Sequence, residues 1–506
     1  MKKLTATGIK IIILIISSLI LLNIIWLKND TIPPHFDAAI HLSNVMDYSS
    51  FLKSGQLLRF IGHYSYYPPL AYWITSFFFL IFGVSADIGV ISLSFFLVIM
   101  IISAYLIGKE IKDERFGLIL IISMIGLPFL MSQTREYQLD FPLTGLLILN
   151  IYLFFKSDFL KIRSFAFWFA IVSGLAFLTK WTYLPFFAFM MIYAILTARK
   201  KDRKMILDNV IFVFLVTYLV AGWWYIKNFT NIRSDFLSNI RIAIKEKDPS
   251  IFSLGSLVFY PISLLTNHLR LLLSVLFAVS FWIIRKINNK KISFLLYISG
   301  FYLVVMTFFI NKDHRFIEPI TPLLVFIIAF ALVNIKNHFY RNTAIIIFVF
   351  ISVFNFTTVT FNLNLFPQSV DIKLFKLVIP VYKSWGYTVG PPKNENWHVE
   401  DIINKYSSYK KVLVIIPEDK MFFNYANFSY FGKLYSPQTV IKAIIFNKKQ
   451  AICSPEFDNF DIIVLDGNQI YLSFFYNICC SKKSAFTIAE PSFFLPDMSR
   501  VWIFKK

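Results

Sequence analysis

Long apolar runs separated by short polar segments recur over the first two thirds of the chain. Residues 11–27 contain no charged side chain, and comparable runs follow as far as Phe361. A helix of about 20 apolar residues matches the hydrocarbon thickness of a bilayer. The pattern therefore predicts a polytopic membrane protein with about eleven transmembrane helices. We place them near residues 9–27, 89–108, 117–133, 141–155, 164–180, 182–198, 206–226, 268–284, 292–310, 319–335 and 343–362.

One apolar run is predicted not to cross the membrane. Residues 68–83 begin with Pro68 and Pro69, and the roughly 14 residues that follow are short for a span. A span here would also place the basic loops that follow on the outer side. We therefore expect a juxtamembrane helix in the outer leaflet.

The apolar runs stop after residue 362, and the remaining residues have the pattern of a small α/β domain. Lys411–Pro417 and Phe460–Asp466 are short runs rich in Val, Ile and Leu, bounded by turn residues. Such runs are typical of buried parallel strands.

Two further elements complete this domain. A helix is expected over Pro437–Phe446, and a terminal hairpin is expected from Ala485–Ile488 and Ser499–Phe504. The predicted fold class is mainly α. Residues 1–362 form a transmembrane domain with juxtamembrane helices, and residues 363–506 form an extracytoplasmic α/β domain.

Composition supports the membrane assignment. Hydrophobic residues make up 57% of the chain and charged residues 16%, against about 25% charged in ordinary soluble domains. This excludes a soluble enzyme, a coiled coil and a disordered protein. The net charge of +21 would suit nucleic acid, but the basic residues gather in loops where anionic lipid headgroups lie. We therefore expect membrane lipids, and no nucleic acid, as partners.

The short basic loops predict the orientation in the membrane. If all of them are cytoplasmic, the N-terminus is cytoplasmic and the C-terminus is extracytoplasmic. The loops are Lys109–Arg115, Lys156–Arg163, Arg199–Lys204, Arg285–Lys291 and Lys336–Arg341. The Lys-, Ile- and Asn-rich composition favours a bacterial inner membrane.

Ionisable side chains at the outer ends of the predicted spans are the candidate functional residues, because charge near a bilayer is costly. Carboxylates, a lysine and arginines at one membrane face could bind a phosphate and deprotonate a hydroxyl. They lie in residues 35–41, residues 135–140, Lys180 and residues 313–315.

Five short motifs follow one another along the chain. They are Phe36-Asp37-Ala-Ala-Ile-His41, Tyr67-Pro68-Pro69-Leu70-Ala-Tyr72, Arg135-x4-Asp140-Phe-Pro-Leu, Gly174-Leu-Ala-Phe-Leu-Thr-Lys180 and His314-Arg315-Phe-x2-Pro319-x2-Pro322. Their order and spacing resemble the GT-C superfamily of integral-membrane glycosyltransferases, which use polyprenyl-phosphate sugars. The similarity is greatest to the protein O-mannosyltransferase-like group, which includes the lipid A aminoarabinose transferase, and it covers nearly the whole chain.

The sequence departs from this family at two positions. The family commonly has two adjacent acids in the first outer loop, whereas Ala38 follows Asp37 here. The residue before the Pro-Pro pair is often His or Lys, and here it is Tyr67. Arg59, His63 or Lys180 could take the place of that phosphate ligand.

The resemblance implies a single displacement that inverts the anomeric centre. Asp37 would deprotonate the acceptor hydroxyl while cations stabilise the leaving lipid phosphate. The donor and its phosphate would be bound by Lys180, Arg315, Arg135, Arg59 and Tyr67. The substrates would be positioned by Asp140, which could also orient Arg135, by His41 and by His314.

Structural roles are the alternatives for these residues. Asp37 could cap a helix that starts at Ala38, and Asp140 could cap the fourth span, with Pro142 in its first turn. Lys180 and Arg315 could serve as anchors at the membrane interface.

A metal site is considered because Asp37 and His41 lie four residues apart, on one face of a helix near His35, and some GT-C enzymes use a divalent cation. No clear third carboxylate accompanies them. We therefore expect no metal and no other cofactor, with a divalent cation as the alternative.

The predicted function is transfer of a sugar from a polyprenyl-phosphate donor to a hydroxyl on protein, lipid or glycan. The alternatives are a transporter or lipid flippase, and a non-catalytic membrane scaffold. Transporters usually show internal repeats and charges near the bilayer midplane, whereas the charges here lie at one face. The sequence leaves the donor sugar and the acceptor open.

Overall fold

The computed structural model describes residues 6–361, 371–374, 377–380, 388, 390–416, 420–445, 460–466, 487–488 and 493–505. The chain forms two compact units, each built from several segments. Unit 1 comprises Met1–Asn23, Leu57–Ile74 and Val90–Pro391. Unit 2 comprises Ile24–Gln56, Thr75–Gly89 and Pro392–Lys506. The two units follow packing and not chain order, and the domain boundary expected at residue 362 stays a prediction.

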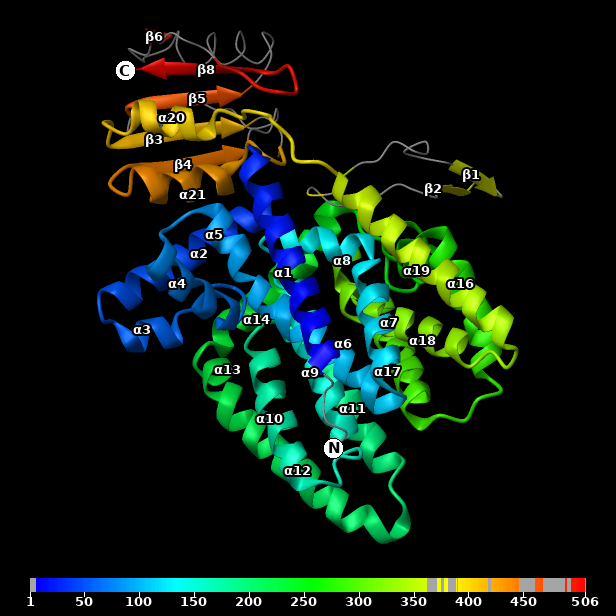
Figure 1. Cartoon of the computed structure of the whole chain (residues 1–506). Helices are drawn as coiled ribbons and strands as arrows, with labels where there is room; N and C mark the ends of the chain where they lie inside the picture. The colour runs from blue at the N-terminus through cyan, green and yellow to red at the C-terminus, as the bar shows by residue number, and fades with distance from the viewer. Residues whose placement is uncertain are drawn as a thin grey trace. The chain divides into compact units, whose positions relative to one another are not determined.

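The described residues are mainly helical (Figure 1). The helices that precede residue 362 are α1 (Ala6–Asn29), α2 (Phe36–Lys53), α3 (Leu57–Gly62), α4 (Leu70–Phe82), α5 (Ala86–Ser92), α6 (Ser94–Ile111), α7 (Glu114–Ile125), α8 (Pro128–Ser132), α9 (Asp140–Lys156), α10 (Arg163–Phe177), α11 (Leu184–Leu196), α12 (Arg203–Thr217), α13 (Trp223–Lys227), α14 (Phe229–Glu246), α15 (Leu254–Ser263), α16 (Arg270–Ile284), α17 (Lys290–Thr307), α18 (Thr321–Val333) and α19 (His338–Phe361).

The multi-pass membrane character is confirmed, but the number of eleven spans is not. Within the described residues, six helices are long and apolar enough to cross a membrane, or up to eight if each of two bent pairs counts as one span. One pair bends by 75° between α7 and α8, and the other by 116° before α16. Pro128 begins α8, and a proline cannot continue the hydrogen-bond ladder of a preceding helix. Helices such as α10 and α11 are apolar but have only 15 and 13 residues.

Close helix packing in unit 1 depends on small and apolar residues. A Cβ atom added at Gly108 of α6 would lie 2.4 Å from the Cα atom of Gly117 in α7. Small residues of this kind let helix backbones touch, the usual way in which membrane helices associate. All residues of α18 are buried, and α18 packs against α7, α16, α17 and α19. A helix that is hydrophobic on every side belongs at the centre of such a bundle.

Unit 2 contains a mixed sheet with the strand order β4-β3-β5-β8-β6, and β7 pairs with β8 (Figure 1). The strands are β3 (Lys411–Ile416), β4 (Val440–Ile445), β5 (Ile462–Asp466), β6 (Thr487–Ile488), β7 (Phe493–Phe494) and β8 (Arg500–Lys505). Helix α20 (Val399–Tyr406) precedes β3 in the chain, and α21 (Tyr425–Tyr435) connects β3 to β4. In unit 1, β1 (Asp371–Leu374) and β2 (Leu377–Pro380) form an antiparallel pair.

The predicted buried strands are confirmed: β3 and β5 are parallel neighbours, with Val412 opposite Ile462. The helix expected over residues 437–446 is wrong, because this segment forms β4, parallel to β3. Its β-branched residues favour a strand once a partner is present. The pairing of the terminal hairpin is confirmed where it is described, with Ile488 opposite Phe504; residues 485–486 lie outside the described residues.

Candidate functional site

The predicted site residues fall into both compact units. Unit 2 contains Asp37 and His41, whereas unit 1 contains the rest. The convergence of Asp37 with the cations therefore stays a prediction. The predicted residues in unit 1 are Arg59, Tyr67, Arg135, Asp140, Lys180, His314 and Arg315.

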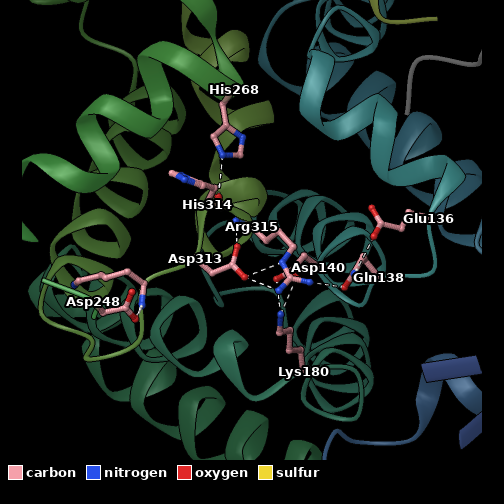
Figure 2. Close-up of polar contacts among 10 residues, drawn as sticks. Glu136, Gln138, Asp140, Lys180, Asp248, His268, Asp313, His314 and Arg315 are labelled. Atoms are coloured by element: carbon pink, nitrogen blue, oxygen red, sulfur yellow. Dashed lines mark hydrogen bonds and ion pairs between the residues drawn. The ribbon is translucent and has the colours of Figure 1, made fainter. Parts of the chain in front are cut away.

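A buried ion pair joins Asp140 and Lys180 (Figure 2). The Lys180 Nζ atom lies 2.6 Å from Asp140 Oδ1 and 2.7 Å from Oδ2. Only 1% of Asp140 and 4% of Lys180 is exposed. Lys180 is therefore not an anchor that reaches toward the interface. The capping role considered for Asp140 is also wrong, because Asp140 is the first residue of α9 and Leu139 precedes it as the N-cap.

Two aromatic rings flank the ammonium group of Lys180. The Nζ atom lies 5.4 Å from the ring centroid of Tyr67 and 5.3 Å from that of Phe316. Both distances are within the range of cation–π attraction. Tyr67 also packs edge-on against Trp181, with centroids 5.8 Å apart. The structure therefore brings together three of the residues predicted for the donor site: Tyr67, Asp140 and Lys180.

Arg315 links the short helix His314–Ile320 to the segment that precedes α9. Its Nε atom donates to Asp313 Oδ2 at 2.8 Å, and its Nη1 atom donates to Gln138 Oε1 at 2.9 Å. Gln138 in turn donates to Glu136 Oε1 at 3.2 Å. Gln138 was not predicted from the sequence, because an uncharged amide in a short loop carries no distinctive signal. The arginine is held in place by a carboxylate and an amide and is not a simple interfacial anchor.

Glu318 is a second residue that the sequence analysis missed. It is fully buried, and its two carboxyl oxygen atoms accept no hydrogen bond from the residues that the structure describes. The charges of Asp140, Lys180 and Arg315 act on it. An acid within the apolar run before Pro319 was a usable signal, because intramembrane acids are functional candidates by default.

The cations of this cluster therefore do not outnumber its acidic groups. Lys180 is paired with Asp140, Arg315 is paired with Asp313, and Glu318 adds a further buried carboxyl group. A phosphate that entered would have to take over contacts that carboxylates now make.

His314 packs between neighbouring helices. Its Nδ1 atom lies 2.9 Å from Ser263 Oγ, and its ring stacks on Phe259 with centroids 4.8 Å apart. The carbonyl oxygen of His314 lies 2.9 Å from His268 Nε2 (Figure 2). These contacts fix the backbone from which Arg315 projects.

Contacts of Lys312 hold the loop that precedes Arg315 in the chain. The Lys312 Nζ atom donates to the carbonyl oxygens of Met306, Thr307 and Phe309, at 3.1, 2.6 and 2.7 Å. This satisfies carbonyl groups that the end of α17 leaves open. The Lys312 backbone N–H donates to Asp248 Oδ2 at 2.8 Å. Burial raises the pKa of Asp248 above its usual range.

Arg135 and Arg59 lie in different surroundings. Arg135 is buried, and it donates to Asn23 Oδ1 of α1 at 3.2 Å and to Thr360 Oγ1 of α19 at 3.0 Å. These bonds hold helices from the two ends of unit 1 together. Arg59 is exposed on α3. The donor-binding roles expected for both arginines stay predictions.

In unit 2, Asp37 lies in the first turn of α2 and is partly exposed. The helix begins at Phe36 with His35 as its N-cap, so the cap expected from Asp37 before Ala38 is wrong. A carboxylate in the first turn is stabilised by the helix dipole. His41 lies one turn further and is buried.

No group of three His, Cys, Asp or Glu side chains that could hold a metal ion is found among the described residues. The expected absence of a metal or another cofactor stays a prediction.

Part of the chain is similar to a known protein family. Residues 67–224 match the model of the dolichyl-phosphate-mannose-protein mannosyltransferase family. An uncharacterized protein of Aquifex aeolicus (strain VF5) is 27% identical over 320 residues, which cover 61% of this chain and 59% of that protein. The chain thus spans about six tenths of the length of this curated relative.

The fold is similar to that of ArnT from Cupriavidus metallidurans. Its crystal structure in the apo state superposes with a TM-score of 0.61 at 12% identity, covering 99% of this chain and 98% of that one. The structure bound to undecaprenyl phosphate gives a TM-score of 0.60, with the same identity and coverage. The resemblance to membrane glycosyltransferases and the mainly helical polytopic fold class are therefore confirmed.

Proposed function

We propose that this chain transfers a sugar from a polyprenyl-phosphate donor to a hydroxyl acceptor, with inversion at the anomeric carbon. The observation that carries the proposal is the buried pair of Asp140 and Lys180 against Tyr67. All three residues lie within the segment 67–224 that matches the mannosyltransferase family. The related fold of ArnT has been crystallised with undecaprenyl phosphate, a lipid of the class that such a donor contains.

The reaction is a single displacement. The acceptor oxygen attacks the anomeric carbon, and its proton passes to the Asp37 carboxylate. The bond between the anomeric carbon and the phosphate oxygen breaks, and the electron pair leaves with the polyprenyl phosphate. Cations that face the phosphate stabilise the developing charge, the kind of contribution that usually dominates transfer reactions.

Lys180 is the cation best suited to this task. A lysine ammonium group has three N–H donors, and among the described residues Asp140 takes the two hydrogen bonds that are observed. Arg315 offers a planar fork that matches a phosphate in a bidentate manner. Because both cations already have carboxylate partners, the phosphate would replace part of these contacts, and Asp140 would become available to a sugar hydroxyl.

The remaining assignments belong to the same proposal. The donor sugar is a hexose or a pentose, and the acceptor is a protein, a lipid or a glycan. The reaction takes place at the outer face of a bacterial inner membrane, with the N-terminus cytoplasmic and the C-terminus outside. The short basic loops support this orientation.

The test follows the leaving group, which is the same for every donor sugar. The full chain is reconstituted with a mixture of synthetic undecaprenyl-phosphate hexosides and pentosides and a bacterial envelope glycan extract. Release of undecaprenyl phosphate is then measured. Asp37→Asn should lower the release rate by about 10²- to 10⁴-fold, the usual contribution of a positioned base.

Asp208→Asn is the matched control, because Asp208 is exposed on α12 and the variant should retain full activity. Equal rates in the wild type and in Asp37→Asn would remove Asp37 from the mechanism. No release by the wild type would favour the transporter or scaffold alternatives.

A further inference from the structure

The helix that carries Asp37 is held at its N-terminal end by residues from the far end of the chain. Asn427 of α21 donates a hydrogen bond from Nδ2 to the carbonyl oxygen of Pro34. The ring of Phe36 packs edge-on against Tyr425, with centroids 4.9 Å apart and an interplanar angle of 89°. All of these residues belong to unit 2. Two contacts from α21 therefore act on the residues immediately before Asp37.

A second contact with α21 lies further along the same helix. The Lys433 Nζ atom lies 2.8 Å from each carboxylate oxygen of Asp47. Ten residues separate Asp37 from Asp47, which is about 15 Å along an α-helix. Contacts at both ends of this distance oppose rotation of α2 about its axis as well as sliding along it.

The helix that makes these contacts is itself firmly built. Asn424 caps α21 by accepting hydrogen bonds from Ala426 N at 2.9 Å and Asn427 N at 3.1 Å. Phe428 belongs to the core of the sheet domain. A Cβ atom added at Gly432 would lie 2.4 Å from Ile441 Cδ1 of β4, so α21 lies directly against the sheet. Asn427 is fully buried, and its position is set by this packing.

The chain that leads into α2 is tied to the same domain. The Thr31 N–H donates to the Lys393 carbonyl oxygen at 2.9 Å, and the Lys393 N–H donates to Asp30 Oδ1 at 2.8 Å. Segment 30–36 is thus anchored by segment 393–395 at its start and by α21 at its end. The loop before Asp37 is therefore held at both ends.

We propose that α21 positions the general base, and that Asn427 is a positioning residue which acts on Asp37 through the Pro34 carbonyl group. The inference rests on the proposed function, because it presumes that Asp37 takes the acceptor proton. It assigns the sheet domain a part in turnover that does not require this domain to touch the substrate. A displacement of about 1 Å in a reacting group can cost about 10²-fold in rate.

The first experiment compares Asn427→Ala with Asn404→Ala in the full chain. Asn404 is an exposed residue of α20 in the same domain, and its variant should behave as the wild type. Asn427→Ala should lower the maximal rate of undecaprenyl phosphate release by about 10- to 100-fold. The donor KM should change by less than about twofold, because the cations that face the phosphate belong to unit 1. Amide hydrogen exchange of residues 36–42 should become faster in this variant alone.

The second experiment exchanges the charges of one contact. Lys433→Asp should lower the maximal rate by about two- to fivefold, the range expected for a partly exposed pair. The double variant Lys433→Asp with Asp47→Lys should restore the rate. This comparison does not depend on Asn427, so poor folding of Asn427→Ala would leave a separate route to the answer.

The outcomes separate the inference from the proposed function. Loss of turnover in Asp37→Asn together with wild-type rates in Asn427→Ala and Lys433→Asp would overturn the positioning role alone. A parallel change in KM and in the maximal rate would also overturn it, because that pattern indicates general damage. Full turnover in Asp37→Asn would refute Asp37 as the base, and with it the premise of the inference.

Discussion

The buried pair of Asp140 and Lys180 allows a quantitative prediction from the structure. At an effective dielectric constant of about 20, two unit charges about 3 Å apart attract each other by roughly 6 kcal/mol. Desolvation of the two ions offsets much of this attraction. Removal of one partner leaves the other charge buried without compensation, which typically costs about 3–5 kcal/mol. Lys180→Met and Asp140→Leu should each lower the free energy of unfolding by this amount.

The double variant shows how much of the loss in each single variant comes from the charge left unpaired. With both charges replaced by apolar groups of similar volume, the loss should shrink to less than about 2 kcal/mol. The free energies are measured by reversible unfolding in mixed micelles with increasing SDS, followed by far-UV circular dichroism. The double variant should fold but release no undecaprenyl phosphate, because it lacks the phosphate-binding cation.

Lys109→Met is the control, because its partner Glu114 lies at 3.1 Å and both side chains are partly exposed. Lys109→Met should lower the free energy of unfolding by only about 0–1 kcal/mol. If Lys180→Met also cost less than about 1 kcal/mol, the two charges would not form a buried pair, and the site described here would be incorrect.

Three further predictions concern single groups. Arg315→Ala should raise the donor KM and lower the maximal rate of undecaprenyl phosphate release, because the guanidinium binds the donor phosphate in the ground state and binds it more tightly in the transition state, when negative charge develops; a change in only one of them would contradict this. Glu318→Gln should change binding of undecaprenyl phosphate by less than about twofold in a lipid-binding titration, because an isolated buried carboxyl group is neutral and the amide has the same shape; a change of about tenfold or more would refute this. Burial raises the pKa of Asp30 from 3.8 to about 6, so the folded state favours the neutral acid, and its stabilising effect is lost as pH rises from about 4 to 6. Amide exchange at Thr31, corrected for its intrinsic rate, should become faster over this range, and Asp30→Asn should abolish the dependence.

The elements that the sequence predicted well are those whose own composition determines them. The runs at β3 and β5 are rich in Val, Ile and Leu and need no particular partner to be recognised as buried strands. The segment of β4 contains Lys442 and Ala443, which weaken a strand pattern. Its conformation is decided by pairing with β3, which no local pattern contains.

The same distinction applies to the site. Asp140 and Lys180 were each predicted, because charged residues at the ends of apolar runs stand out. The two residues lie 40 positions apart and form a buried ion pair. This pairing was not predictable from either segment alone. The sequence also counted apolar runs as straight spans, whereas Arg270 adopts a left-handed conformation, with φ of 57°, at the start of α16 after a sharp bend.

The complete burial of α18 has a consequence for the way the bilayer acts on this protein. Thr321–Val333 follows directly on the short helix that carries Arg315 and Glu318, and protein surrounds it on every side. A change of lipid species or bilayer thickness acts on helices whose side chains face the hydrocarbon, such as α12 with its exposed Ile211 and Leu215. Helix α18 is insulated from such changes by the helices packed around it. Its side chains should therefore keep the same surroundings in membranes of different composition, while the outer helices adapt.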